Sequence, residues 1–132
     1  MTARIAAPLA GLAGFAAVLV FVFWPGDSAA RSSAPAGSGS SPSYVVQLTA
    51  PADRPAEVVV RRHDGAATRL AAVTLEPAMP QMGHAVPAVL AQRAGADRFT
   101  TREALLPMPG RWEVLVLLGE GPDAEFVLVQ VE

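Results

Sequence analysis

The sequence predicts an all-β domain that follows an uncharged N-terminal segment. Three observations support this prediction. A run without charged residues lies near the N-terminus, a stretch of small residues follows it, and short β-type runs fill the chain from residue 44 to the C-terminus. The chain has 132 residues, which is enough for one domain and one accessory segment.

The N-terminal run predicts a membrane-spanning helix. Residues 5–24 contain no charged side chain and follow a short cationic start that includes Arg4. Twenty helical residues span about 30 Å, the thickness of the hydrocarbon core of a bilayer. Trp24 suits the interface, and Pro25 ends the helix because proline lacks a backbone N–H. We therefore expect residues 1–25 to form one N-terminal transmembrane anchor of a bacterial inner-membrane protein, with the C-terminal domain in the periplasm.

A cleaved signal segment is the alternative. Residues 28–30 read Ser-Ala-Ala, as in a small-residue cleavage site. The most apolar part, residues 15–24, is only about ten residues long, which suits a signal peptide. Against cleavage, the whole uncharged run is longer than a usual signal core. Cleavage near Ala30 would give a secreted domain, and in both cases the residues after Pro25 are exported.

The next segment, residues 26–43, predicts a flexible linker. It consists mainly of glycine, serine, alanine and proline and shows no apolar period, so it has nothing from which to build a packed core. Random-coil scaling gives its 18 residues a mean span of about 24 Å. We expect the domain itself to occupy residues 44–132.

The domain divides into seven β-type runs separated by turn residues. The predicted strands cover residues 44–49, 57–62, 68–75, 85–93, 98–105, 111–118 and 125–131. The Asp64-Gly65 step favours a hairpin turn, Pro77 ends the third run, and Pro87 indicates an edge or a bulge. Such spacing without an amphipathic helix predicts a seven-stranded immunoglobulin-like antiparallel sandwich with Trp112 in its core. A small barrel is the alternative.

Composition excludes several classes of function. The net charge is −2 and the ten cationic residues are all arginine, without the cationic cluster that nucleic-acid binding requires. No cysteine is present, which excludes disulfides, thiol catalysis and thiolate zinc sites. No serine follows Ser43, and the adjacent His63 and Asp64 suit a solvated turn because strand neighbours point to opposite faces. We expect no enzymatic activity and no nucleic-acid partner.

One segment carries candidate chemistry. Residues 79–84 read Met-Pro-Gln-Met-Gly-His, and thioether and imidazole groups are donors suited to Cu(I). In an extended chain Met82 and His84 point the same way, so they are the main predicted copper ligands, with Met79 and Met108 as further donors. In the opposing interpretation the methionines fill an irregular end of the core and the histidine bonds a backbone carbonyl. The pattern leaves both open.

Three motifs follow one another along the domain: the segment at residues 79–84, a Gly-x-x-x-Phe stretch at residues 95–99, and Met-Pro-Gly-Arg-Trp-Glu-Val at residues 108–114. In this order they resemble the YtkA-like or FixH-type domain family. The resemblance covers residues 44–132. It departs from the family pattern at Gln81, where glycine is common, and at Phe99, where tyrosine is common.

The resemblance implies an exported, immunoglobulin-like and often membrane-anchored domain that is associated with copper handling. The matching positions are Met79, Met82, His84, Met108 and Trp112. We therefore expect a module that passes copper to a membrane-protein or copper-trafficking partner, near which a tether raises the effective concentration. The alternative is a metal-free interaction or assembly module that docks on a membrane protein through its sheet edge or its methionine-rich end.

Overall fold

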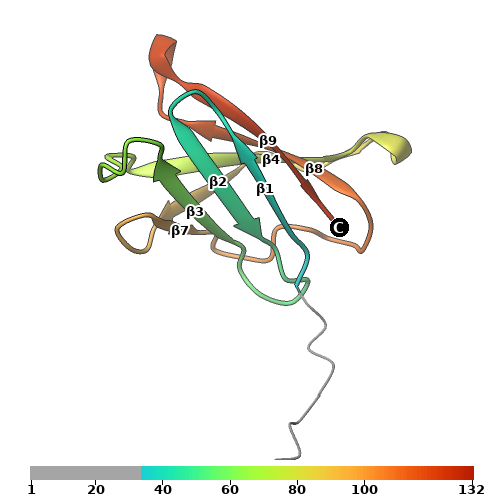
Figure 1. Ribbon diagram of the computed structural model, residues 1–132. Helices are drawn as coiled ribbons and strands as arrows, with labels where there is room; N and C mark the ends of the chain where they lie inside the picture. Colours follow the sequence, from blue (N-terminus) through green and yellow to red (C-terminus); the bar gives the residue numbers. More distant parts are fainter. Residues whose placement is uncertain (1–33) are drawn as a thin grey trace, which may run out of the picture. The chain divides into compact units, whose positions relative to one another are not determined.

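A computed structural model describes residues 34–132, and these residues fold into antiparallel β-strands (Figure 1). The all-β prediction is confirmed. Within the described range the helical elements are two 3-10 turns, Pro80–Met82 and Gly121–Asp123. No helix in this range is long and apolar enough to cross a membrane. The predicted anchor at residues 1–25 and the cleavage site near Ala30 lie outside the described residues.

The strands join into one nearly closed sheet. Their bounds are β1 Ala36–Ser40, β2 Tyr44–Thr49, β3 Glu57–Arg62, β4 Ala72–Met79, β5 His84–Ala85, β6 Val89–Arg93, β7 Arg98–Thr100, β8 Trp112–Leu118 and β9 Glu125–Val131. Hydrogen bonds connect them in the order β1-β2-β3-β7-β6-β4-β8-β9, and β5 pairs with β4. The first strand of this order, β1, lies against the last, β9 (Figure 1). The ladder is thus one continuous sheet that almost closes into a barrel.

Alternation along the strands supplies the core. In β8 every second side chain from Trp112 to Leu118 is buried, and in β9 the same holds for Val127, Val129 and Val131. Trp112 is 0% exposed, which confirms its predicted place in the core. Burying one large aliphatic or aromatic side chain contributes about 1.5–3 kcal/mol. The inward side chains therefore hold opposite parts of the nearly closed sheet together.

Several predicted strands match the structure closely. The runs at residues 44–49, 57–62 and 125–131 are β2, β3 and β9 with the same bounds. The run at residues 111–118 is β8, which begins one residue later. The single strand predicted at residues 85–93 is instead two strands, β5 and β6, on either side of Pro87, and β6 lies inside the sheet between β7 and β4 rather than at an edge.

The prediction that all of residues 26–43 form a linker is wrong for its second half. Ala36–Ser40 is the strand β1, paired antiparallel with β2. Its two glycines permit close packing against β9. A Cβ on Gly37 would overlap the carbonyl oxygen of Gln130, and a Cβ on Gly39 would lie 2.7 Å from the carbonyl oxygen of Leu128. The absence of side chains lets β1 approach the backbone of β9, so the folded domain begins before residue 44.

The prediction that the third strand covers residues 68–75 and stops at Pro77 is also wrong. That strand, β4, is Ala72–Met79 and contains Pro77. The carbonyl of Pro77 accepts a hydrogen bond from the Val86 N–H at 3.0 Å. The N and O atoms of one strand residue point to the same side. The side of Pro77 that lacks an N–H therefore faces β5 and β6, at the point where the pairing of β4 with β6 ends and its pairing with β5 begins. Proline therefore removes no hydrogen bond to β8.

The Asp64-Gly65 turn forms, but it does not make a hairpin. The Gly65 N–H donates to the Arg62 carbonyl at 3.1 Å, and Gly65 has a φ of 73°. The strands on either side are not paired, because β3 pairs with β2 and β7 whereas β4 pairs with β5, β6 and β8. The turn instead starts a connection that crosses from one part of the sheet to another.

The predicted strand at residues 98–105 is also shorter than expected. It ends as β7 at Thr100. The next residue, Thr101, is fixed by side-chain bonds, since its hydroxyl accepts from the Ala56 N–H at 2.8 Å and donates to the Glu103 carbonyl at 2.6 Å. The chain then leaves the sheet, and Leu105 and Leu106 pack into the core from the irregular segment.

Candidate functional site

The methionine–histidine segment forms the tip of a hairpin. Met79, the last residue of β4, is the register partner of His84, the first of β5. Between them lie a 3-10 turn at Pro80–Met82 and Gly83, whose φ of 61° is left-handed. This hairpin, yellow in Figure 1, projects from the rest of the sheet. The segment is therefore a tight turn and not the extended stretch on which the shared orientation of Met82 and His84 was predicted.

The second methionine motif lies beside this hairpin. The indole N–H of Trp112 donates to the carbonyl oxygen of Met108 at 3.0 Å. The rings of His84 and Trp112 meet edge-on, with centroids 5.9 Å apart and planes at 73°. From the turn, the Gln81 amide donates to the Arg111 carbonyl at 2.9 Å. The fold thus brings together the two motifs that are separated in the sequence.

The four predicted donors differ in exposure. Met79 is 2% exposed, whereas Met82 is 66% and Met108 38% exposed, and His84 is exposed as well. Met79 packs beneath the second motif, because a Cβ on Gly110 would lie only 2.8 Å from the Met79 Cε. Met79 therefore fills the end of the core, while Met82, Met108 and His84 are exposed residues.

The chemistry available at this end of the sheet is that of soft donors. Thioether sulfurs and a neutral imidazole bind Cu(I) without losing a thiol proton. In the part of the chain that the structure describes, no three His, Asp or Glu side chains gather where they could hold a metal ion. The soft donors in these two motifs are the thioethers of Met79, Met82 and Met108 and the imidazole of His84, a set of residue types that suits Cu(I) better than harder cations.

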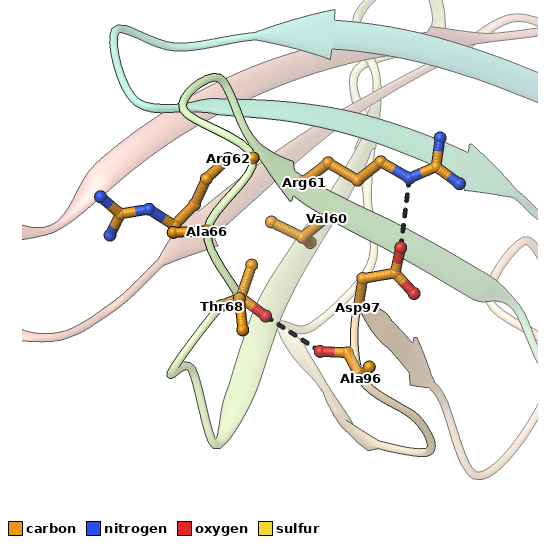
Figure 2. A pocket seen from close by; sticks show the side chains of 9 residues that line it. Val60, Arg61, Arg62, Ala66, Thr68, Ala96 and Asp97 are labelled. Atoms are coloured by element: carbon orange, nitrogen blue, oxygen red, sulfur yellow. Dashed lines mark hydrogen bonds and ion pairs between the residues drawn. The ribbon is translucent and has the colours of Figure 1, made fainter.

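A hollow of about 370 Å³ lies between the β3–β4 connection and the β6–β7 turn. Figure 2 shows Arg61 reaching toward Asp97, with Nε 3.1 Å from the carboxylate oxygen, and the Thr68 hydroxyl donating to the Ala96 carbonyl at 3.3 Å. Arg61 and Asp97 thus bond each other, and the Thr68 hydroxyl bonds a backbone carbonyl. The sequence did not indicate this hollow, because its walls come from two connections that are distant along the chain.

His63 and Asp64, beside this hollow, do not form a base and its orienting carboxylate. The His63 Nε2 lies 3.0 Å from the carbonyl oxygen of Ser41. The Asp64 carboxylate instead accepts hydrogen bonds from Arg62 and from the Ala66 N–H. Hydrogen bonding by the Arg62 guanidinium, followed by the bond from Ala66, lowers the pKa of Asp64 to about 2.

Arg93 has a positioning role that sequence reasoning missed. Its guanidinium donates to the carbonyl oxygens of Thr68 at 2.9 Å, Leu70 at 2.6 Å and Gly95 at 3.0 Å, and it lies 5.1 Å from the ring centroid of Phe99. One side chain thus fastens the β3–β4 connection to the β6–β7 turn. No local pattern indicates this, since the carbonyl partners are backbone groups of loops.

Comparisons of the chain with protein-family models, with curated proteins and with solved structures find no match in any of the three. The resemblance to the YtkA-like family therefore stays a prediction from the motifs.

Proposed function

We propose that the chain is a non-enzymatic, extracytoplasmic β-domain that handles copper through Met82, His84 and Met108. The observation that carries this proposal is that the hairpin with Met82 and His84 lies against the second methionine motif, which contains Met108, and that these three residues are exposed in part or in full. Met79 supports the hairpin from within the core rather than acting as a ligand. An exposed donor set of this kind suits an ion that is passed on, because a partner is able to reach it.

The finer fold assignment belongs to the same proposal. The order β2-β3-β7-β6 followed by β4-β8-β9 corresponds to strands A-B-E-D and C-F-G of an immunoglobulin constant-type sandwich. The ladder between β6 and β4 joins what would otherwise be two sheets. This order and the two methionine motifs support membership of the YtkA-like or FixH-type family.

We also propose that the domain is tethered to a membrane. The uncharged run at residues 5–24 supports a single-pass anchor, and tethering would hold the copper site close to a membrane partner. Release after cleavage near Ala30 would leave the same site on a secreted domain.

Anaerobic titration of the full chain with Cu(I) against a competing chelator tests the copper proposal. We expect the wild type to retain copper and the Met82→Ala/His84→Ala variant to lose at least about tenfold in affinity, since even supporting groups around a metal contribute about 10–100-fold. Met108→Ala should weaken binding as well. His63→Ala is the matched control, because His63 is also exposed but lies in the turn after β3.

Two outcomes would contradict copper handling. The first is equal copper retention by the wild type and the Met82→Ala/His84→Ala variant. The second is an equal loss of affinity in His63→Ala, which would mean that histidines bind copper without regard to position.

A metal-free docking module is the second candidate. The interpretation in which all the methionines fill the end of the core does not agree with the 66% exposure of Met82. A different surface favours docking, however: the outward side of β6, β8 and β9 carries large apolar side chains.

A further inference from the structure

Large apolar side chains lie on the outward side of the strands β6, β8 and β9. We call this surface the apolar face; its apolar side chains are Leu90 of β6, Leu115 and Leu117 of β8, and Phe126 and Leu128 of β9. Cross-strand register places Leu117 opposite Phe126 and Leu115 opposite Leu128. Leu90, Phe126 and Leu128 are 54%, 60% and 53% exposed. Leu115, Leu117, Phe126 and Leu128 therefore form one apolar cluster on β8 and β9, and Thr74 of β4, the register partner of both Leu90 and Leu117, lies between this cluster and Leu90.

The composition of β8 and β9 is that of strands covered on both sides. A strand with one wet face alternates apolar and polar residues, but β8 reads Trp-Glu-Val-Leu-Val-Leu-Leu and places leucines outward as well as valines inward. Four strands about 4.8 Å apart and about seven residues long give a sheet face of roughly 450 Å², which includes Thr74, Glu76 and Glu113 as well as the apolar side chains. The largest apolar patches on monomeric proteins often have a function.

Unpaired negative charge lies within the same face. Glu76 of β4 stands opposite Leu115, and Glu113 of β8 stands opposite Ala78, so the two carboxylates are diagonal neighbours. Together with Leu115 and Leu128 they line one shallow hollow. Within the described residues neither carboxylate forms an ion pair. The carboxylates that do pair with arginine belong to other parts of the fold: Asp53, Glu57, Asp64, Asp97 and Glu132.

We propose that the apolar face docks a segment of a partner protein that is apolar and carries lysine or arginine side chains. Its apolar residues would cover the leucines and Phe126, and its cations would pair with Glu76 and Glu113. Complementary charge of this kind selects the partner and fixes its register. The proposal is independent of the copper site, because it uses none of the methionines and neither histidine.

A second copy of the chain fits this face poorly. Two apolar faces packed together would bring Glu76 and Glu113 of both copies into one interface, and buried charge without a partner opposes association. The cation that borders this face, Arg69, lies beside Leu90 and Leu117 and not in the hollow of Glu76 and Glu113. An anionic bilayer would be repelled by the same carboxylates.

The test uses the full chain in nanodiscs of zwitterionic lipid, with empty nanodiscs as the blank. Two fluorescently labelled amphipathic peptides of equal length are titrated, one of leucine and lysine and one of leucine and glutamate. Fluorescence anisotropy should show the lysine peptide binding at least about tenfold more tightly. Phe126→Ser/Leu128→Ser should abolish binding, and Glu76→Gln/Glu113→Gln should remove the preference. Val45→Ser is the control, since Val45 is an exposed apolar residue of β2.

A second measurement keeps the proposal testable if a variant fails to fold. Hydroxyl-radical labelling of wild-type Phe126 and Leu128 should fall when the lysine peptide is added. Four results would overturn the proposal: equal affinity for both peptides, binding unaffected by the Phe126→Ser/Leu128→Ser change, concentration-dependent dimers that this change abolishes, or binding of the face to anionic vesicles. Protection of Phe126 and Leu128 in the dilute chain alone would also overturn it, because residues 1–33 would then be the occupant.

Discussion

At the residue scale, the turn after β3 fixes an exposed carboxylate by local bonding. The Nη2 of Arg62 lies 2.6 Å from one oxygen of Asp64, and the Ala66 N–H donates to the other at 2.9 Å. Charge-assisted bonds of this geometry favour the ionised carboxylate. Solvent surrounds both side chains, so the pair shapes the turn more than it stabilises the whole domain.

This bonding predicts the pH dependence of Asp64. Its pKa is lowered to about 2 in the folded chain, below the ordinary value of about 3.9 in an unfolded one. Any stability that the ionised group contributes is therefore complete above the unfolded value and is lost as the pH falls through about 2. Carboxyl NMR titration should find that Arg62→Gln raises the midpoint toward the ordinary value, while Arg54→Gln leaves it unchanged. A wild-type midpoint near the ordinary value would contradict the geometry.

The residue types of the candidate copper site could be predicted from sequence, but their exposure could not. The motif fixes which donors are close along the chain. Whether each faces water depends on Pro80 starting a 3-10 turn and on Gly83 reversing the chain, which the assumption of an extended segment did not include. The burial of Met79 depends further on Gly110, a residue of the distant second motif.

At the scale of the elements, β1 shows that a glycine- and serine-rich segment is able to act as a structural strand. Gly37 and Gly39 face β9 at backbone distance, while Ser38 and Ser40 are exposed. Its pairing with β2 runs through all five residues, and the Ala50 N–H extends it with a bond to the Pro35 carbonyl at 2.8 Å. The strand thereby covers an edge that would otherwise be open.

Substitutions in β1 should separate a packed strand from a flexible linker. Gly39→Val forces a side chain against Val127 and the Leu128 backbone, and overpacking of this kind costs about 1–3 kcal/mol. Urea denaturation should show this loss, and hydrogen exchange should show reduced protection of the β1 and β2 amides. Ser38→Val is the matched control on the exposed side of the strand. Equal behaviour of the two variants would mean that β1 does not pack on β9.

The strands that sequence predicts correctly are those whose own residues carry the pattern. The bounds of β2, β3 and β9 follow from alternating valines and leucines between turn residues. β1 has no such pattern, and its role becomes visible only beside β9. β4 extends past Pro77 because its neighbours on that side change, which is a property of the sheet and not of the strand.

At the scale of the whole molecule, closure of the sheet depends on pairings between distant segments. β3 pairs with β7 and β4 pairs with β8, so the connection between β3 and β4 has to cross the fold without a ladder of its own. Backbone carbonyls in such a connection need partners. Arg93 supplies them from β6, which places one side chain at the point where the two halves of the sheet are joined.

Arg93→Lys should therefore lower the stability of the whole domain while keeping the charge. Lysine lacks the planar fork that reaches the carbonyls of Thr68, Leu70 and Gly95 at once. Hydrogen bonds from a charged group contribute about 1.5–3 kcal/mol, so a loss of that order should appear as a lower urea midpoint in one cooperative transition. Arg102→Lys is the control, because in the described part of the chain Arg102 takes part in no side-chain hydrogen bond or ion pair. If both variants unfold at the same urea concentration, the crossing connection is held by its own turns, and Arg93 only covers it.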